Sequence, residues 1–343
     1  MRDKELDIIK GLACILMVVA HAGTLGKTIE NSFTTLLWYL AFFAPILFFA
    51  SVGISLIHQL KKRSVMKILV FNIIFLVISF ADIGKQSLNY LDITKPNLIA
   101  SLAIATIFSL IFRKVNGLLI LILLLAMDRF ANRFLIPPTL IYGLPFALIP
   151  WAGITTLGRY LYLNKKSLIY ILAIGFLITL YYVLVKHQTI STQFLTSLFL
   201  GLSLVIYSSV AISASRISNI PILSSFLTYL GENTLLFYWL HLFILFMISF
   251  QLPAPLMWAF VLMITIISIK ILKKVNDLTL KKLSYGPWFW VTITLAVFIP
   301  LVTPLSQQTQ FFFFTALTII FALNYHQLLQ LKLLDHIERF TKL

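Results

Sequence analysis

Apolar stretches of about twenty residues follow one another along the whole chain, and no other feature constrains the fold as strongly. They lie near residues 6–26, 33–58, 66–83, 97–112, 115–128, 139–162, 167–185, 193–214, 223–250, 254–272, 287–303 and 310–328. Each resembles a helix that crosses a bilayer, whereas barrel strands give shorter segments of alternating hydrophobicity. The sequence therefore predicts an all-α, polytopic transmembrane helical bundle of about 10–12 spans, the lower number applying if 97–112 and 115–128 form one re-entrant pair.

The composition supports this class of protein. Hydrophobic residues make up 60% of the 343 residues and charged residues only 11%, too little polar surface to cover a water-soluble globule. The single cysteine, Cys14, excludes an internal disulfide and a cysteine metal cluster, and no metal is expected. We predict one transmembrane domain over 1–343 with no separate soluble domain, in which 329–343 form a short amphipathic tail on the cytoplasmic surface.

The distribution of positive charge predicts the orientation. Placing the N-terminus in the cytoplasm puts most of the 27 Lys and Arg residues on the inner side, as the positive-inside rule requires. We therefore predict a multi-pass protein of the cell membrane with both termini in the cytoplasm. The net charge of +16 fits this bias and an attraction to anionic lipid headgroups, so nucleic acid is not expected as a partner.

The first predicted span, “LDIIKGLACILMVVAH”, carries ionisable residues. Asp7, Lys10, Cys14, Met17 and His21 recur at steps of three and four residues, which places them on one face of a helix. Lys10 and His21 are about three turns apart, roughly 16 Å along the axis. Ionisable groups in membrane helices are costly and usually face a bundle interior or a cavity.

Two interpretations of these side chains stay open. Asp7 and Lys10 can form a helix-end pair, with the acid at the positive end of the helix dipole and the lysine reaching the interface, while His21 lies among outer headgroups without a function. Alternatively, His21 is a neutral imidazole that acts as a general base inside a cavity, since an unperturbed imidazole titrates at about pH 6.5.

Three motifs resemble a known family, the integral-membrane acyltransferase 3 family. “RDKELDIIKGLACILMVVAH” resembles its opening, in which a basic residue and ten further residues precede a histidine at the end of the first helix; Lys10 and His21 satisfy that spacing. “FFAPILFFASVGISL”, residues 42–56, is similar to its second helix before a basic loop, although the Ser51-Val52-Gly53 step is one residue wider than usual. “GENTLLFYWLH”, residues 231–241, resembles a late-helix motif of the same superfamily.

A fourth stretch is similar to a related branch. “FALIPWAGITTLGRYL”, residues 146–161, looks like the PWxGxxxxG stretch of the branch that contains heparan-glucosaminide N-acetyltransferases. That branch is expected to carry a further histidine in the loop after the first helix, and “AGTLGKTIENSF” has none. The histidine at the end of the first helix therefore favours the O-acyltransferase branch.

The resemblance implies a membrane O-acyltransferase, in the first instance an O-acetyltransferase. It would move an acyl group from cytoplasmic acyl-CoA, expected to be acetyl-CoA, to a hydroxyl of a cell-envelope glycan or a lipid-linked sugar. His21 is the expected general base, with Asp7, Lys10, Asn233 and His241 in support. The residues expected to contact acyl-CoA are Lys61, Lys62, Arg63, Trp151 and Arg159. The basic loop fits the positive-inside rule equally well, and His241 fits a structural, hydrogen-bonded histidine equally well.

Two other classes of protein remain alternatives. A transporter or flippase for a sugar or lipid also explains many spans and buried polar residues, but it predicts matched Gly/Pro-interrupted helices in two halves. The Pro-rich break “LIPPTLIYGLPFALIPW” has no evident partner of this kind. A structural or sensory membrane protein requires Lys10, His21, Asn233 and His241 to be incidental, despite the free energy of placing them in a membrane.

Overall fold

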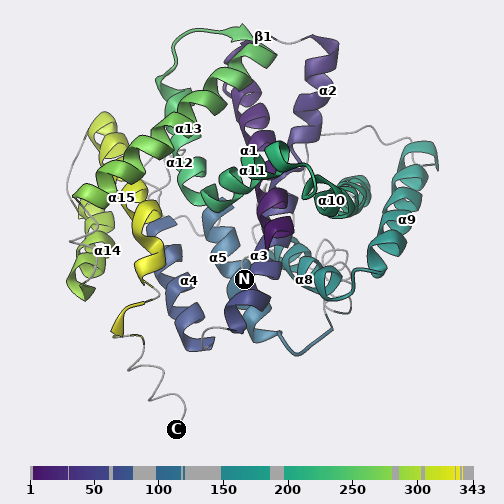
Figure 1. Cartoon of the computed structure of the whole chain (residues 1–343), viewed down its shortest axis with the longest axis horizontal. Helices are drawn as coiled ribbons and strands as arrows, with labels where there is room; N and C mark the ends of the chain where they lie inside the picture. Colours follow the sequence, from purple (N-terminus) through teal and green to yellow (C-terminus); the bar gives the residue numbers. More distant parts are fainter. Residues whose placement is uncertain are drawn as a thin grey trace. The chain divides into compact units, whose positions relative to one another are not determined.

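The structure is a computed structural model. It describes residues 3–29, 31–61, 65–79, 98–116, 119, 148–185, 197–279, 286–302, 306–328, 330–332 and 334. The elements, labelled in Figure 1 where there is room, are α1 (Lys4–Thr24), β1 (Thr28–Ile29), α2 (Ser32–Ala41), α3 (Ala44–Leu60), α4 (Val65–Ser79), α5 (Leu98–Ile111), α8 (Leu148–Leu163), α9 (Ser167–Leu180), η1 (Tyr181–Val185), α10 (Ser197–Ile217), α11 (Pro221–Glu232), α12 (Thr234–Met247), β2 (Leu252–Pro253), α13 (Ala254–Leu278), α14 (Pro287–Val302) and α15 (Gln307–Leu328). The predicted stretch 115–128 and the tail 329–343 lie almost entirely outside the described residues.

The helical prediction is confirmed wherever the structure describes an apolar stretch. Within the described residues, four segments are long and apolar enough to cross a membrane: Lys4–Thr24, Ser32–Leu60, Ser167–Val185 and Ala254–Leu278. The second of these combines α2 and α3, which are joined by a turn at Phe42 and Phe43. The other apolar helices are shorter.

The predicted span over 223–250 is broken at Asn233 into two helices, which can still form one span together. α11 ends at Glu232 and α12 begins at Thr234, and the two are long enough to cross a membrane only when they are counted together. Asn233 has φ −109° and ψ 18°, outside the α-helical region, and it is the N-cap residue of α12. Asparagine is favoured at such positions and disfavoured inside helices.

The described chain forms two compact units, each assembled from separate segments. The first unit comprises residues within 1–20, 35–58 and 93–232. Its helices cross at glycines: a Cβ built at Gly11 would overlap the backbone of Leu227, and one at Gly231 would overlap the backbone of Asp7. α3 and α8 meet in the same way, since a Cβ at Gly53 would overlap the carbonyl of Thr155. The motif glycines therefore allow these helix backbones to touch.

The second unit comprises residues within 21–34, 59–92 and 233–343. Its α12 is buried on nearly every side and packs against α13 and α15. α14 and α15 contribute the aromatic core around Trp290, Phe314 and Phe321, against which Phe71 and Phe75 of α4 pack. Asn276 of α13 and Asn324 of α15 exchange two amide hydrogen bonds of 3.1 and 2.9 Å, so both buried side chains are satisfied.

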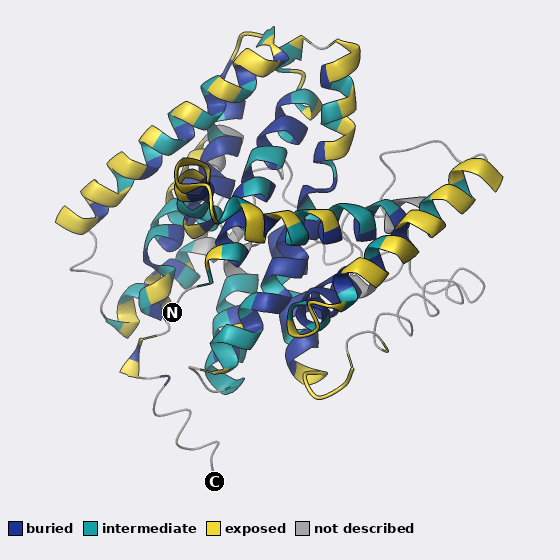
Figure 2. Ribbon diagram, turned by 45° about the vertical axis from the view of Figure 1, so that its right-hand side comes forward, coloured by how far each residue is buried: buried dark blue, intermediate teal, exposed yellow. Residues whose placement is uncertain are grey.

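Two of the candidate spans expose apolar surface along their length. α13 buries a single stripe that includes Met257, Val261 and Ile269, and its exposed face carries large apolar residues. α9 likewise leaves Ile169, Tyr170 and other large apolar residues exposed. Figure 2 shows in yellow the exposed faces of the helices. Exposed apolar surface of this extent is unfavourable in water and is typical of helices that contact lipid or another apolar partner.

Candidate functional site

His21 and His241 lie side by side in the second unit. His21 is in the last turn of α1 and is half-buried, whereas His241 is in the middle of α12 and is 0% exposed. His21 Nδ1 lies 2.8 Å from His241 Nε2, and the two rings are nearly parallel, with 7° between their planes. The structure thus brings together two predicted site residues that are 220 positions apart in the sequence.

The hydrogen bonds determine which ring nitrogen carries each proton. His241 Nδ1 lies 2.9 Å from the carbonyl oxygen of Phe237, one turn earlier in α12. A carbonyl only accepts, so His241 Nδ1 donates and the Nε2 of the neutral ring holds a lone pair. His21 Nδ1 must then donate to that lone pair. In neutral His21 the remaining lone pair is therefore on Nε2, the nitrogen that does not bond to His241.

Aromatic rings hold His241 in place. Its ring centroid lies 5.5 Å from that of Phe237 and 6.0 Å from that of Tyr238. Both neighbours are buried, as are Trp239 and Leu240, the two residues between Tyr238 and His241 in the sequence. A buried imidazole with both nitrogens engaged and its faces packed has little freedom to rotate, so His21 meets an acceptor in one defined position.

A short clasp joins the ends of the two helices that carry the histidines. β1 and β2 pair in parallel, with Thr28 opposite Leu252 and Ile29 opposite Pro253. Gln251 Nε2 donates to the Gly26 carbonyl at 2.7 Å, and Lys27 Nζ donates to the Ile248 carbonyl. The turn needs a positive φ at Gly26, which glycine adopts without strain. The clasp therefore fixes the end of α1 against the end of α12.

The three other predicted supporting residues do not join the histidine pair. Asp7 is buried and Lys10 is half-buried, both in the part of α1 that belongs to the first unit. α1 is unbroken from Lys4 to Thr24, so Lys10 stays about three turns from His21. Asn233 is buried at the start of α12, about 12 Å along the helix from His241. Their supporting roles stay predictions.

The residues expected to contact acyl-CoA differ in their exposure to solvent. Lys61 is an exposed turn residue at the end of α3, whereas Lys62 and Arg63 lie outside the described residues. Trp151 is 0% exposed and stacks on Phe49 of α3, with 4.5 Å between ring centroids. A role for Trp151 in binding a coenzyme stays a prediction, and in this conformation none of its surface is open to a ligand.

Arg159 makes contacts that explain its burial without a ligand. It is 6% exposed, and its guanidinium donates to three carbonyls at the C-terminal end of α5: Ser109 at 3.0 Å, Phe112 at 3.2 Å and Val115 at 3.3 Å. These carbonyls lie at the end of a helix, where partners within the helix are missing and a cation is favoured by the dipole. Arg159 therefore caps α5, and its predicted contact with acyl-CoA stays a prediction.

We expect Arg159→Met to destabilise the protein by about 1–3 kcal/mol, because the buried hydrogen bond to the Ser109 carbonyl and two partly buried ones are lost together. Arg113→Met is the matched control: Arg113 is exposed and donates to one carbonyl, that of Leu110, so its loss should change stability far less. Thermal unfolding in detergent measures both. Equal effects of the two variants would contradict the capping role.

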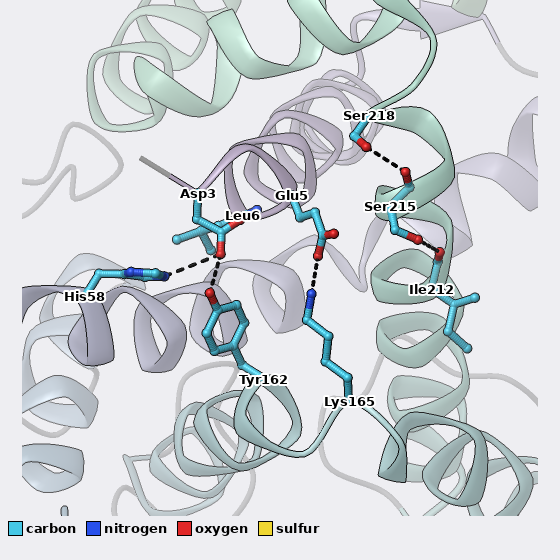
Figure 3. Close-up of polar contacts among 9 residues, drawn as sticks. All are labelled: Asp3, Glu5, Leu6, His58, Tyr162, Lys165, Ile212, Ser215 and Ser218. Atoms are coloured by element: carbon cyan, nitrogen blue, oxygen red, sulfur yellow. Dashed lines mark hydrogen bonds and ion pairs between the residues drawn. The ribbon is translucent and has the colours of Figure 1, made fainter. Parts of the chain in front are cut away.

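A polar cluster surrounds the start of α1 in the first unit (Figure 3). Tyr162 of α8 donates its hydroxyl to Asp3 at 2.6 Å, and His58 Nε2 of α3 lies 3.4 Å from the same carboxylate oxygen. The other oxygen of Asp3 accepts from the Leu6 N–H at 3.1 Å and so caps α1. Burial by itself would raise the pKa of Asp3, but these hydrogen bonds and the nearby imidazole outweigh it and hold the pKa below its ordinary value of 3.8.

This shift predicts a pH dependence of stability. A carboxylate whose pKa is lowered by folding stabilises the protein above its unfolded pKa, and that contribution is lost as the pH falls through the lowered value. We expect Asp3→Ala to cost about 1–2 kcal/mol at neutral pH, from the lost cap and the lost acceptor, and progressively less as the pH falls below about 4.

Asp3→Asn separates the two effects, because it keeps a capping oxygen but does not titrate. The stability of Asp3→Asn relative to the wild type should therefore improve as the pH falls through the lowered pKa of Asp3. Thermal unfolding measures this from neutral pH down to pH values below the pKa of an ordinary carboxyl group. A difference that does not change with pH would contradict the assignment.

Asp3, His58 and Tyr162 were not among the predicted site residues. An acid directly before an apolar helix is a recognisable N-cap signal, so Asp3 could have been found from the sequence. Nothing in the sequence indicates that Tyr162 and His58 meet it. The Phe237 carbonyl is a backbone group, and no sequence pattern distinguishes it from its neighbours.

Comparison with known proteins adds no identification: no family model matches the chain, and neither the curated proteins nor the solved structures give a significant match. Among the described residues, no group of three or more His, Cys, Asp or Glu side chains is arranged to hold a metal ion.

Proposed function

We propose that the chain is a membrane O-acyltransferase in which His21 is the general base and His241 orients it. The observation that carries the proposal is the chain of hydrogen bonds from the Phe237 carbonyl through His241 to His21. It favours the tautomer of His21 whose free lone pair is on Nε2. An orienting group behind a catalytic imidazole is the arrangement used wherever histidine activates a hydroxyl for acyl transfer.

The proposed reaction uses His21 for one proton. A hydroxyl oxygen of the acceptor attacks the carbonyl carbon of an acyl-CoA thioester, and its proton passes to His21 Nε2. The tetrahedral intermediate collapses with cleavage of the carbon–sulfur bond, and the coenzyme A thiolate leaves and takes up the proton. The imidazolium formed on the way is stabilised because His21 Nδ1–H still donates to His241.

The substrates and the location belong to the same proposal. The sequence motifs support acetyl-CoA as the donor and a cell-envelope glycan or lipid-linked sugar as the acceptor. The long apolar helices and the exposed apolar faces of α9 and α13 support a multi-pass protein of the cell membrane. The bias of Lys and Arg supports cytoplasmic termini, which would let acetyl-CoA approach from the inner side.

The test begins with the donor. Purified protein in detergent is titrated with acetyl-CoA by calorimetry, comparing the wild type with His21→Ala and with a triple alanine variant of Lys61, Lys62 and Arg63. Saturable binding that survives His21→Ala and weakens in the triple variant supports the proposal. The second step incubates the protein with radiolabelled acetyl-CoA and envelope lipid-linked sugars, and follows acetyl transfer to the sugar.

One result at each step would overturn a part of the proposal. A folded wild type that does not bind acetyl-CoA overturns the proposal and favours a transporter or flippase. His21 and His241 would then be candidates for binding its substrate or a proton. Binding without transfer to any hydroxyl acceptor would keep the donor site and remove the O-acyltransferase assignment.

A further inference from the structure

A cavity of about 220 Å³ lies inside the first unit. It is lined by the first turns of α1, the middle of α3, the end of α8, the start of α9 and the last turns of α10, and it opens to the surface. Its lining includes Glu5, Leu6, Ile54, Lys165, Leu168, Tyr207 and Ala211. All of its lining residues belong to the first unit, and neither histidine of the pair is among them.

The interior of the cavity is apolar. Leu6, Ile54, Leu168 and Ala211 line it, and Tyr207 is buried at its wall. An engineered apolar cavity of about 150 Å³ binds benzene, so an apolar space of this size is large enough for a short hydrocarbon chain. It is smaller than the usual pocket for a drug-sized ligand, about 300–1,000 Å³, which excludes a large or branched ligand.

The rim of the cavity is charged and open to solvent. Figure 3 shows the Lys165 and Glu5 side chains pointing toward each other. Lys165 Nζ lies 2.8 Å from Glu5 Oε2, and the two side chains are 57% and 33% exposed. An exposed pair of this kind contributes only about 0–1 kcal/mol, so another anion can replace Glu5 as the partner of Lys165.

Exposed basic residues outnumber exposed acidic residues next to the lining residues in the sequence. Lys4 precedes Glu5, Lys166 follows Lys165 and Arg216 follows Ser215, and all three are exposed. Lys4 Nζ donates to the Ser218 carbonyl at 2.9 Å, close to the end of α10. On the acidic side, Asp3 already accepts from Tyr162, which leaves Glu5 as the partner of Lys165. The excess favours a ligand with a negative head and disfavours one with a positive head.

We propose that this cavity binds a short single-chain anionic amphiphile: the hydrocarbon chain fills the space between α1, α3 and α10, and the carboxylate or phosphate head replaces Glu5 at Lys165. The chain supplies affinity through burial of apolar surface, and the lysine supplies the preference for charge. Medium-chain fatty acids and alkyl phosphates share this chemistry.

A chain-length series tests the apolar part. The wild type in phosphatidylcholine nanodiscs is titrated by calorimetry with butyrate, hexanoate, octanoate, decanoate and laurate, and the signal from empty nanodiscs is subtracted. Each added methylene should tighten binding by about three- to fourfold until the cavity is full, after which the affinity should stop rising. Non-specific partition into lipid gives no such limit.

Cavity variants test the location. Ala211→Phe fills the space and should abolish the rise with chain length, and Ala211→Leu should shift the limit to a shorter chain. Ser213→Phe is the matched control, because Ser213 is an exposed residue of the same helix that does not line the cavity. It should bind like the wild type.

Head-group variants test the charge. For octanoate and octyl phosphate, Lys165→Gln should weaken binding by about two- to fivefold and Glu5→Gln should tighten it by a similar factor. Octanol should respond to neither variant, and octyltrimethylammonium should bind worst. A difference between octanoate and octyl phosphate then tells which anion the rim prefers.

Three results would overturn the inference. They are a signal no larger than that of empty nanodiscs, equal binding by Ala211→Phe and Ser213→Phe, and binding of the alkylammonium as tight as that of the carboxylate. Competition between octanoate and acetyl-CoA would also overturn it, because the cavity would then belong to the path of the acyl donor.

Discussion

His21→Ala is expected to lower acyl transfer by about 10²–10⁴-fold while the affinity for acetyl-CoA stays close to that of the wild type. The reason is that the imidazole accepts the proton of the attacking hydroxyl and takes no part in holding the donor. Transfer is measured with radiolabelled acetyl-CoA and an envelope acceptor, and binding by calorimetry. A loss of donor affinity that accounts for the whole loss of rate would falsify the assignment of His21 as a base.

Variants of His241 test whether this residue orients the base. His241→Leu removes the acceptor for His21 Nδ1–H and should also lower the rate, whereas His241→Gln offers a side-chain oxygen at a similar reach and should restore part of it. Because the two histidines act as one unit, the double variant of His21→Ala and His241→Leu should be no slower than His21→Ala alone. His326→Ala is the control, a histidine in α15 outside the pair.

The pH dependence separates orientation from mere packing. If His241 sets the tautomer of His21, His241→Gln should change the pH profile of the rate as well as its maximum. A purely structural role for His241 predicts a lower amount of folded protein with an unchanged profile per folded molecule. If the rate loss of the double variant equalled the product of the losses of the two single variants, the histidines would act independently. That result would also contradict a common unit.

Gly53→Ala is expected to destabilise the first unit by about 3 kcal/mol or more, at the upper end of the range for overpacking. The Cβ would overlap the carbonyl oxygen of Thr155, and the neighbouring backbone N–H of Arg159 is also close, so no flexible side chain can move aside. Both α3 and α8 would have to separate. This would disturb the stacking of Phe49 on Trp151 and the cap that Arg159 provides.

Gly286→Ala is the matched control for this prediction. It adds the same methyl group at a position where no atom lies within 4 Å, so we expect a change of about 0.5 kcal/mol or less. Both variants are compared by thermal unfolding in the same detergent. A wild-type melting temperature for Gly53→Ala would contradict the close crossing of α3 and α8 that Gly53 and Gly158 indicate.

The reciprocal position provides a second readout. Gly158 faces the backbone of Ala50 as Gly53 faces that of Thr155, so Gly158→Ala should be destabilising as well. Once either alanine has forced the helices apart, the other should add little, and the double variant should lose less stability than the sum of the two. Additive losses would indicate two independent contacts.

The helices could be predicted from the sequence because their signal is local. α1 spans Lys4–Thr24 where 6–26 was expected, and α13 spans Ala254–Leu278 where 254–272 was expected. An apolar stretch of this length forms a helix almost wherever it lies, since each backbone group is satisfied within the segment. The stretch 223–250 was expected as one span because its apolar residues continue on both sides of Asn233, where the structure ends one helix and begins another.

The candidate site was predictable only in part. His21 and His241 could each be selected, since an ionisable group in an apolar helix is costly and calls for an explanation. Their contact could not be inferred from the sequence, because the two lie far apart in it and the helical pattern does not say which helices are neighbours. Arg159 is the opposite case: it was expected to contact acyl-CoA, and its partners are backbone carbonyls at and just after the end of α5.

The sequence by itself determined the helical class, the apolar surfaces and the residue types available for chemistry, because these follow from composition and from periodicity over short distances. Only the tertiary structure decided which glycines become helix crossings, which carbonyls Arg159 caps and which nitrogen of His21 keeps its lone pair. These depend on contacts between segments that are distant in the chain, and the free energy of such contacts has no counterpart in a local pattern of residues.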